Sequence, residues 1–240
     1  MKKNSQKKNR LYSFLKGFFY LPGKILFPTV VIGKRNVPKG KHVAIANHLK
    51  WTDIVLMVLF VPGYRHILGK KELSKNKFLN FICKKLEVIF VDRGAADISS
   101  IRTTVNYLKK DEAVALFPEG TRNRVDESVQ DVKAGAVMFA VKGEAPVLPI
   151  VIHAKSRFFH RNYMMIASQF DFSEYYGQRL TPDILAEGAD KMANILKLSK
   201  QILDFAVTNG EIKKLISIDK SFAISEKLYK RTIKKHGAKK

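Results

Sequence analysis

His42-Val-Ala-Ile-Ala-Asn47-His48-Leu-Lys-Trp-Thr-Asp53 is an apolar run that ends in a histidine, with an aspartate five positions further on. The run has the length and composition of a buried strand, and the nearly all-apolar segment 53–60 that follows it is compatible with a helix. A tight turn between the two would bring Asp53 back towards His48. The stretch therefore predicts a strand–turn–helix unit that presents polar side chains at the end of the strand.

The same arrangement recurs twice further along the chain. A predicted strand at 87–91 leads into Asp92-Arg93, and another at 113–117 leads into Pro118-Glu119-Gly120-Thr121-Arg122. In α/β proteins, ligands bind beyond the carboxyl ends of parallel strands. We therefore expect His48, Arg93 and Glu119 to lie at one rim of a sheet.

Strands and helices alternate along most of the chain. This alternation predicts an α/β fold with a largely parallel central sheet flanked by helices. The other expected strands are 29–33 and 147–153, and the other expected helices are 73–85, 98–110, 135–142 and one that begins near Met192. We expect three parts, namely an N-terminal arm at 1–28, a catalytic domain at 29–208 and a basic tail at 209–240.

The N-terminal arm combines basic residues with aromatic ones. We expect one or two short apolar helices within 11–28, stopped by Pro22 and Pro28, because proline interrupts a helix. No uninterrupted apolar run reaches the roughly 18 residues that a spanning helix needs. The arm is therefore expected to lie in a membrane interface rather than to cross the bilayer. Its aromatic residues are Tyr12, Phe14, Phe18, Phe19 and Tyr20.

The charge of the chain is far from balanced. Forty-four Lys and Arg against 21 Asp and Glu give a formal net charge of +23. This excess indicates a polyanionic partner, which could be nucleic acid, an anionic bilayer or an acidic carrier protein. The aromatic residues beside the N-terminal charges favour a bilayer, although a solvated basic tail stays open. The single cysteine, Cys83, excludes an intramolecular disulfide and fits a reducing compartment.

A histidine that a carboxylate orients can act as a general base. The Asp53 carboxylate would fix the tautomer of His48, which could then take a proton from a hydroxyl group. This is the base half of a serine-hydrolase arrangement, but no Gly-x-Ser-x-Gly motif is present and Cys83 lies far from the motifs. We therefore expect the attacking hydroxyl to belong to the substrate, with direct transfer and no covalent enzyme intermediate.

Together these residues resemble the 1-acylglycerol-3-phosphate acyltransferase family, over about residues 30–154. The first family motif, an Asn-His pair followed by an aspartate in the spacing HX4D, is matched by Asn47, His48 and Asp53. The family usually has a small hydroxyl residue, most often serine, where Lys50 stands. If that hydroxyl caps the following helix, Thr52 could replace it, or the turn could differ. The other three motifs resemble Phe90-Val-Asp92-Arg93, Pro118-Glu119-Gly120-Thr121-Arg122 and Val147-Leu-Pro149.

The resemblance implies a role for each matching residue. His48 and Asp53 would be catalytic, and Arg93 and Arg122 would hold a phosphate bidentately. On the residues alone, Arg93 could equally be a surface arginine paired with Asp92. The remaining substrate-binding residues would be Glu119, which accepts hydrogen bonds from glycerol hydroxyls, Gly120, which lets backbone approach the ligand, and Thr121.

Lys70, Lys71 and the fourth motif allow two interpretations each. The lysines could meet donor phosphates or anionic lipid, or they could lie on a solvated face. The fourth motif could line an acyl tunnel, or its side chains could simply belong to a core strand.

The resemblance also implies an activity. A fatty acyl group would pass from an acyl thioester to the sn-2 hydroxyl of 1-acylglycerol 3-phosphate (lysophosphatidic acid), giving phosphatidic acid for phospholipid biosynthesis. The expected partners are that acceptor, a donor that is acyl-carrier protein or acyl-CoA, and anionic membrane lipids, with no nucleic acid. We expect a peripheral or monotopic protein on the cytoplasmic face of the cell membrane.

Other functions stay open. The acceptor could be glycerol 3-phosphate or another lyso-lipid, and a non-catalytic basic protein that binds membranes or nucleic acid is a more distant alternative. No cofactor and no metal are expected. The reason is that the remaining histidines lack carboxylate neighbours at metal-binding spacing in the sequence. These histidines are His42, His66, His153 and His160.

Overall fold

A computed structural model of the 240-residue chain describes residues 9–92 and 97–221. They form a seven-stranded sheet with the order β1-β7-β6-β2-β5-β3-β4, in which only the β6–β7 pair is antiparallel. The predicted α/β fold with a largely parallel sheet is confirmed. The strands are β1 (Thr29–Ile32), β2 (Val43–Ala46), β3 (His66–Lys70), β4 (Ile89–Val91), β5 (Val114–Leu116), β6 (Val147–Ile152) and β7 (Asn162–Ile166).

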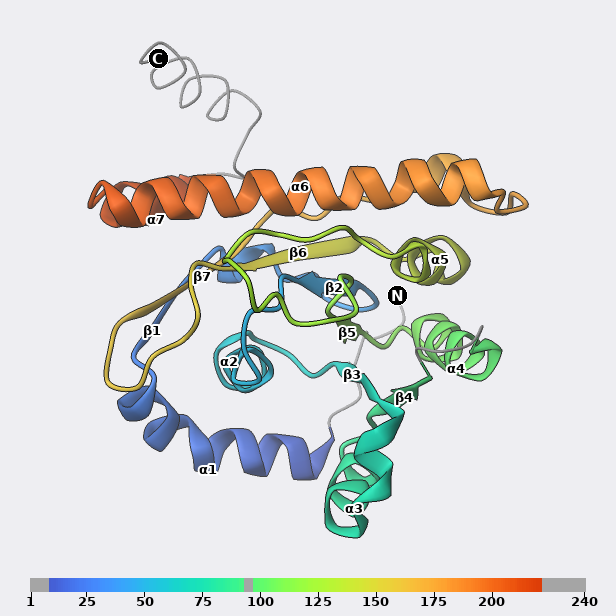
Figure 1. The fold of residues 1–240 in the computed structure, drawn as a ribbon, viewed down its shortest axis with the longest axis horizontal. Helices are drawn as coiled ribbons and strands as arrows, with labels where there is room; N and C mark the ends of the chain where they lie inside the picture. Colours follow the sequence, from blue (N-terminus) through green and yellow to red (C-terminus); the bar gives the residue numbers. More distant parts are fainter. Residues whose placement is uncertain (1–8, 93–96, 222–240) are drawn as a thin grey trace.

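Helices cover both faces of this sheet (Figure 1). The long helix α6 crosses one face beside α5, whereas α2 covers the other face and α1 lies beneath α2. The helices are α1 (Arg10–Leu26), α2 (Asp53–Phe60), α3 (Lys77–Lys85), α4 (Ile98–Lys109), α5 (Ala134–Gly143), α6 (Pro182–Thr208) and α7 (Ile212–Ser221). Short 3-10 helices occupy Lys34–Asn36, Lys71–Lys75 and Ser173–Tyr175.

The central strand β2 is buried on both faces, and its side chains alternate in size. Val43 and Ile45 pack in the apolar cluster that contains residues of α5 and α6. Ala44 and Ala46 point to the other face, where larger residues of α2 fill the space. A strand covered by helices on both faces has a continuous apolar sequence. His48 follows this strand and lies at its carboxyl end.

The N-terminal helix departs from the sequence prediction. Pro22 was expected to stop a helix, but α1 runs from Arg10 to Leu26 with Pro22 inside it. Contacts with α2 and the turn after it hold this helix in place. The Tyr12 hydroxyl bonds the carbonyls of Val58 and Gly63, each at 3.2 Å, and Gly23 packs against Leu59. Tertiary contacts therefore outweigh the local effect of the proline.

Other boundaries also differ from the expectations. β3 and β7 were not expected as strands, and α6 begins at Pro182, ten residues before the expected start at Met192. The expected helix 73–85 is a 3-10 turn followed by the shorter α3. Within the described residues, no helix combines the length and apolarity that crossing a membrane requires.

Candidate active site

The turn that follows β2 is fixed to the neighbouring strand by Asn47. The Asn47 amide donates to the Ile152 carbonyl at 3.0 Å, and its oxygen accepts the Ile152 N–H at 2.7 Å. Asn47 is fully buried, so its amide has no competing bonds with water. This pair of bonds continues the β2–β6 pairing by one residue and sets the direction in which the chain enters His48.

His48 and Asp53 form a dyad at this turn. The Asp53 Oδ2 atom lies 3.0 Å from Nδ1 of His48 and also accepts the N–H groups of Leu49 and Lys50, each at 2.7 Å. Because a carboxylate can only accept, Nδ1 carries the hydrogen. The Asp53 side chain is fully buried and that of His48 is 15% exposed, and the imidazole stacks on the Phe117 ring at 3.9 Å. The Nε2 atom of His48 is then left with a lone pair for a substrate proton.

Glu119, which follows β5, contacts the backbone of the dyad. Its Oε1 atom accepts the backbone N–H of His48 at 3.0 Å, and the residue is only 3% exposed. Burial raises the pKa of Glu119 to about 7, although hydrogen bonds from the backbone of His48 and Gln130 oppose the shift. In the described structure Glu119 therefore contacts the backbone of the catalytic turn, and its expected contact with glycerol hydroxyls stays a prediction.

Gly120 makes the sharp turn that follows. Its φ of +76° lies in the left-handed region, and a Cβ atom there would meet the side chain of Lys133 at 2.7 Å. The positive φ favours glycine, whereas the flexible end of the Lys133 side chain could move away from a Cβ atom. The turn places Thr121 and Arg122, both exposed, on a cavity of about 510 Å³ that His48 also lines. Trp51, Lys70 and Arg124 complete the polar and aromatic part of this lining.

The structure thus brings together most of the expected site residues. His48, Asp53, Glu119, Gly120, Thr121 and Arg122 lie around the ends of β2 and β5. Arg93 lies outside the described residues. Its neighbour Asp92 lines a second cavity, and the ammonium group of Lys71 lies 3.0 Å from the Asp92 carboxylate. Lys70, which on the sequence could meet phosphates, lipid or solvent, lines the cavity of His48. Trp51 lines it too and was not expected there, although it lies between His48 and Asp53 in the sequence.

The second cavity is largely apolar and adjoins the first. It has a volume of about 330 Å³ and shares Leu68, Gly69 and Phe117 with the cavity of His48. Between β4, α4 and α5 it extends along side chains such as Val91, Ile101, Met138 and Phe139. A cavity lined by His48 and two arginines therefore adjoins a largely apolar one, which is an arrangement that suits an amphipathic ligand.

Lys50, the departure from the family pattern, has a defined position. Its ammonium group donates to the Ser156 carbonyl at 3.0 Å. Thr52 precedes α2 but makes no side-chain capping bond, because its hydroxyl pairs with the Ser156 hydroxyl. The suggestion that Thr52 replaces a capping serine is therefore wrong for this structure, and the Asp53 carboxylate holds the turn instead.

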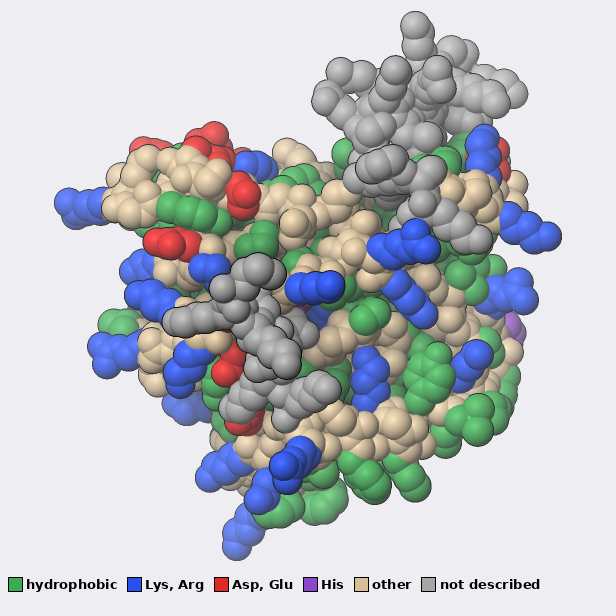
Figure 2. Space-filling view, turned by 180° about the vertical axis from the view of Figure 1, so that it is seen from behind, with side chains coloured by type: hydrophobic (Ala, Val, Ile, Leu, Met, Phe, Trp, Pro, Cys, Tyr) green, Lys and Arg blue, Asp and Glu red, His purple; other side chains and the backbone are tan. Residues whose placement is uncertain are grey.

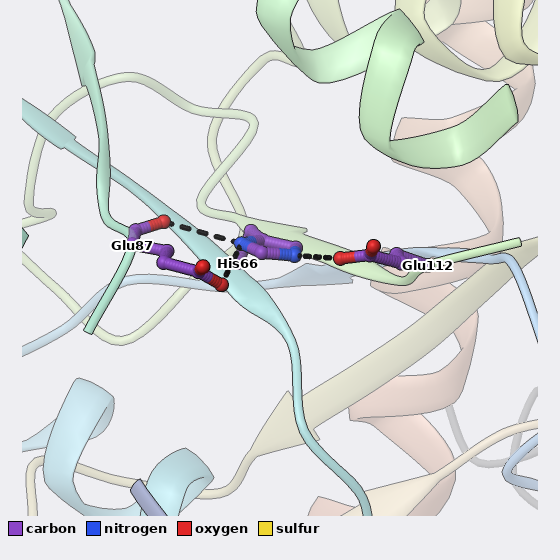
Figure 3. Close-up of side chains that lie close together, drawn as sticks. All are labelled: His66, Glu87 and Glu112. Carbon is purple, nitrogen blue, oxygen red and sulfur yellow. Dashed lines mark hydrogen bonds and ion pairs between the residues drawn. The ribbon is translucent and has the colours of Figure 1, made fainter. Parts of the chain in front are cut away.

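A second histidine cluster lies away from this cavity. The Nε2 atom of His66 is 2.6 Å from Glu112, and Nδ1 is 3.2 Å from the Glu87 carbonyl and 3.7 Å from the Glu87 carboxylate. The two glutamates lie at opposite ends of the ring (Figure 3). A distance of 2.6 Å is that of a direct hydrogen bond and is short for two atoms on one zinc ion. The sequence missed these carboxylates because tertiary structure brings them to His66.

Comparison with known proteins agrees with this geometry. A family model described as Acyltransferase matches residues 29–153. The 1-acyl-sn-glycerol-3-phosphate acyltransferase of Bacillus subtilis is 36% identical over 128 residues, which are 52% of this chain and 63% of that protein. The match therefore spans less than two thirds of that relative. The enzyme of the same name from Borreliella burgdorferi is 28% identical over 185 residues, 69% of this chain and 72% of that protein.

A solved structure shares the fold. It is the crystal structure of the 1-acyl-sn-glycerophosphate (LPA) acyltransferase PlsC from Thermotoga maritima. The TM-score is 0.62 and the identity 26%, and the match covers 83% of each chain.

Proposed function

Because the chain belongs to the acyltransferase family, we propose that it transfers a fatty acyl group from an acyl thioester to the sn-2 hydroxyl of 1-acylglycerol 3-phosphate. The product is phosphatidic acid, and residues 29–208 form the catalytic domain. The names of the relatives support this acceptor. The observation that carries the proposal is the His48–Asp53 dyad at the wall of a cavity that also holds Arg122.

The geometry supports a direct transfer. Asp53 accepts the Nδ1 hydrogen of His48, so Nε2 removes the hydroxyl proton as the acceptor oxygen attacks the thioester carbonyl carbon. A C–O bond forms and the tetrahedral intermediate collapses with cleavage of the C–S bond. The thiolate leaves with the proton returned by Nε2. No protein nucleophile is required, because the acceptor hydroxyl plays that part.

The two adjoining cavities provide places for the polar and apolar parts of the substrates. Arg122 lines the cavity of His48 and, with Lys70, supplies positive charge for the acceptor phosphate. Arg93 is proposed as a further phosphate ligand on the strength of its motif alone. The apolar cavity shared through Phe117 suits a fatty acyl chain. Thr121 and Gly120 complete the proposed substrate-binding set.

A lipid acceptor requires access to a bilayer. The net charge of +23 and the aromatic residues of α1 support peripheral or monotopic association with anionic lipid, and we propose the cytoplasmic face of the cell membrane. Either acyl-carrier protein or acyl-CoA fits as donor, because both carry negative charge towards a basic protein.

Release of thiol from each donor tests the proposal. The assay uses liposomes that contain 1-acylglycerol 3-phosphate, with parallel reactions on glycerol 3-phosphate and on a phosphate-free lyso-lipid. We expect turnover by the wild type on the first acceptor and a loss of at least about 100-fold in His48→Ala. His153→Ala is the matched control, because His153 also pairs with an aspartate, Asp204, at 2.7 Å but lines a different cavity.

Each other outcome changes the proposal in a defined way. Turnover only on another acceptor would retain the acyltransferase and replace its substrate. Equal loss in His48→Ala and His153→Ala would remove the specific role of His48. No turnover with any donor and acceptor would overturn the proposed activity.

A further inference from the structure

Besides α1, two further segments each carry a pair of exposed aromatic side chains. Phe78 and Phe81 of α3 are 70% and 62% exposed, and Phe158 and Phe159 in the loop between β6 and β7 are 48% and 69% exposed. Single exposed apolar residues are ordinary, whereas grouped ones mark interaction surfaces. The exposed apolar residues of α1 are Phe14, Phe18, Phe19, Tyr20, Leu21, Ile25 and Leu26.

Direct contacts join these three elements. At the start of α1, the Asn9 amide donates to the Lys85 carbonyl at the end of α3 at 3.0 Å. At its other end, the Leu26 carbonyl accepts the Phe159 N–H at 2.7 Å, and the Phe27 and Phe158 rings lie 4.6 Å apart. Figure 1 shows α1 along the lower edge, with α3 at one end. We call α1, α3 and the loop 155–161 the aromatic face.

The charges of the aromatic face have one sign. Residues 10–26, 77–85 and 155–161 each contain three Lys or Arg and no Asp or Glu. Figure 2 shows hydrophobic side chains along the lower margin of the molecule, with Lys and Arg beside them. Aromatic residues flanked by cations suit the headgroup region of an anionic bilayer, where the rings enter the interface and the cations meet phosphates.

We propose that the aromatic face docks on an anionic lipid bilayer, and that α3 and the loop 155–161 insert aromatic side chains of their own beside α1. The proposal deepens the proposed function, since it names the surface that would bring the enzyme to a lipid acceptor. It does not depend on catalysis, because α3 and the loop would bind lipid whether or not acyl transfer occurs.

The loop also links the aromatic face to the catalytic turn. Its Ser156 accepts a hydrogen bond from Lys50 and pairs with Thr52, two residues of the turn between His48 and Asp53. A docked loop would therefore hold the dyad at a fixed distance from the lipid surface. The lysine at the usual serine position gains a role in this arrangement, as the bond between the loop and the turn.

Vesicle flotation with the full-length protein tests the proposal. The vesicles contain phosphatidylcholine alone or with 30% phosphatidylglycerol, without acceptor or donor. Phe78→Ala/Phe81→Ala and Phe158→Ala/Phe159→Ala each leave the sequence of α1 unchanged. We expect each to lower the partition coefficient on anionic vesicles by at least about tenfold. Ile98→Ala/Val125→Ala is the matched control, because these side chains are 67% and 91% exposed outside the aromatic face.

A depth measurement separates insertion from charge attraction. In a Cys83→Ser background, a fluorophore on Phe81→Cys should shift to an apolar signal on anionic vesicles, whereas one on Val125→Cys should not. Wild-type binding by both double variants would overturn the proposal and leave α1 as sole anchor. Altered oligomeric state with unchanged vesicle binding would overturn it in favour of a second copy of the chain. Lost acyl transfer with normal flotation would count only against the proposed function.

Discussion

The carboxylate of Glu119 accepts the backbone N–H of His48 at 3.0 Å, across 71 positions of sequence. This bond connects the turn after β5 with the turn after β2, so the third motif supports the first directly. The other carboxylate oxygen, Oε2, is buried without a hydrogen-bond partner among the described residues. An anionic Glu119 is therefore poorly solvated, which agrees with the pKa of about 7 that burial gives it.

Stability should depend on pH through this residue. Between about pH 4.5 and 7, folded Glu119 holds a proton that the unfolded chain has released, so the free energy of unfolding falls as the pH rises. Over the full window the change is at most about 3 kcal/mol. Denaturant unfolding of wild type and Glu119→Gln at pH 5 and pH 8 measures it, and we expect the wild type to lose more stability than the variant.

A second buried group makes the comparison with Glu119→Gln necessary. Burial and the nearby Arg65 lower the pKa of His42 to about 3. The unfolded chain then binds a proton below about pH 6.5 that the folded protein does not, so His42 makes stability fall as the pH falls. This opposite slope is common to both proteins and cancels in their difference. A difference that stays flat from pH 5 to pH 8 would contradict the raised pKa of Glu119.

The role of Asp53 is tested by an isosteric change. Asp53→Asn keeps the shape of the side chain but removes the charge that fixes the Nδ1 hydrogen of His48. The asparagine side chain also has one acceptor oxygen in place of two, so it would satisfy the N–H groups of Leu49 and Lys50 less well. We expect kcat to fall by roughly 100-fold to 10,000-fold with a smaller change in KM. Steady-state thiol release measures both, and a change confined to KM would argue against orientation of the base.

Arg122 should affect one substrate selectively. Its side chain is exposed on the cavity of His48, where a phosphate can approach. Loss of a charge-assisted hydrogen bond is worth about 1.5–3 kcal/mol, so Arg122→Ala should raise KM for the phosphate-bearing acceptor about 10-fold to 100-fold. KM for the thioester should stay nearly constant. Arg179→Ala, an exposed arginine that lines none of the cavities described above, is the control, and equal losses on a phosphate-free acceptor would contradict the prediction.

The sequence predicted the part of the fold in which local pattern and tertiary packing agree. The helix expected at 53–60 is α2, with the same bounds. Its apolar residues pack against the sheet, so the local pattern and the tertiary contacts favour the same structure. β3 was not predicted, because only Ile67 and Leu68 are apolar between its polar ends. It forms a strand because it pairs with β4 and β5. The prediction that Pro22 stops a helix was wrong, because α1 is held by contacts with α2 that a local sequence rule does not include.

The site divides in the same way. The His48–Asp53 contact spans five positions and follows from a strand–turn–helix unit, so the sequence could indicate it. The contact between Glu119 and His48 depends on the pairing of β2 with β5, which no local pattern contains. The carboxylates around His66 arrive through the same kind of pairing, since His66 lies beside Val114 across the β3–β5 pair.

His66 provides a prediction about stability alone. Its ring is fully buried and bonded to Glu112 and the Glu87 carbonyl, and His66→Ala would leave the largely buried Glu112 carboxylate without this partner. We expect a loss of about 2–4 kcal/mol in the free energy of unfolding, whereas the exposed His160→Ala should change it by less than about 0.5 kcal/mol. Hydrogen bonds rather than a metal ion would hold the cluster, so a chelator should leave the wild-type melting temperature unchanged. A chelator-induced drop in that temperature, abolished in His66→Ala, would instead establish a metal site between the two glutamates.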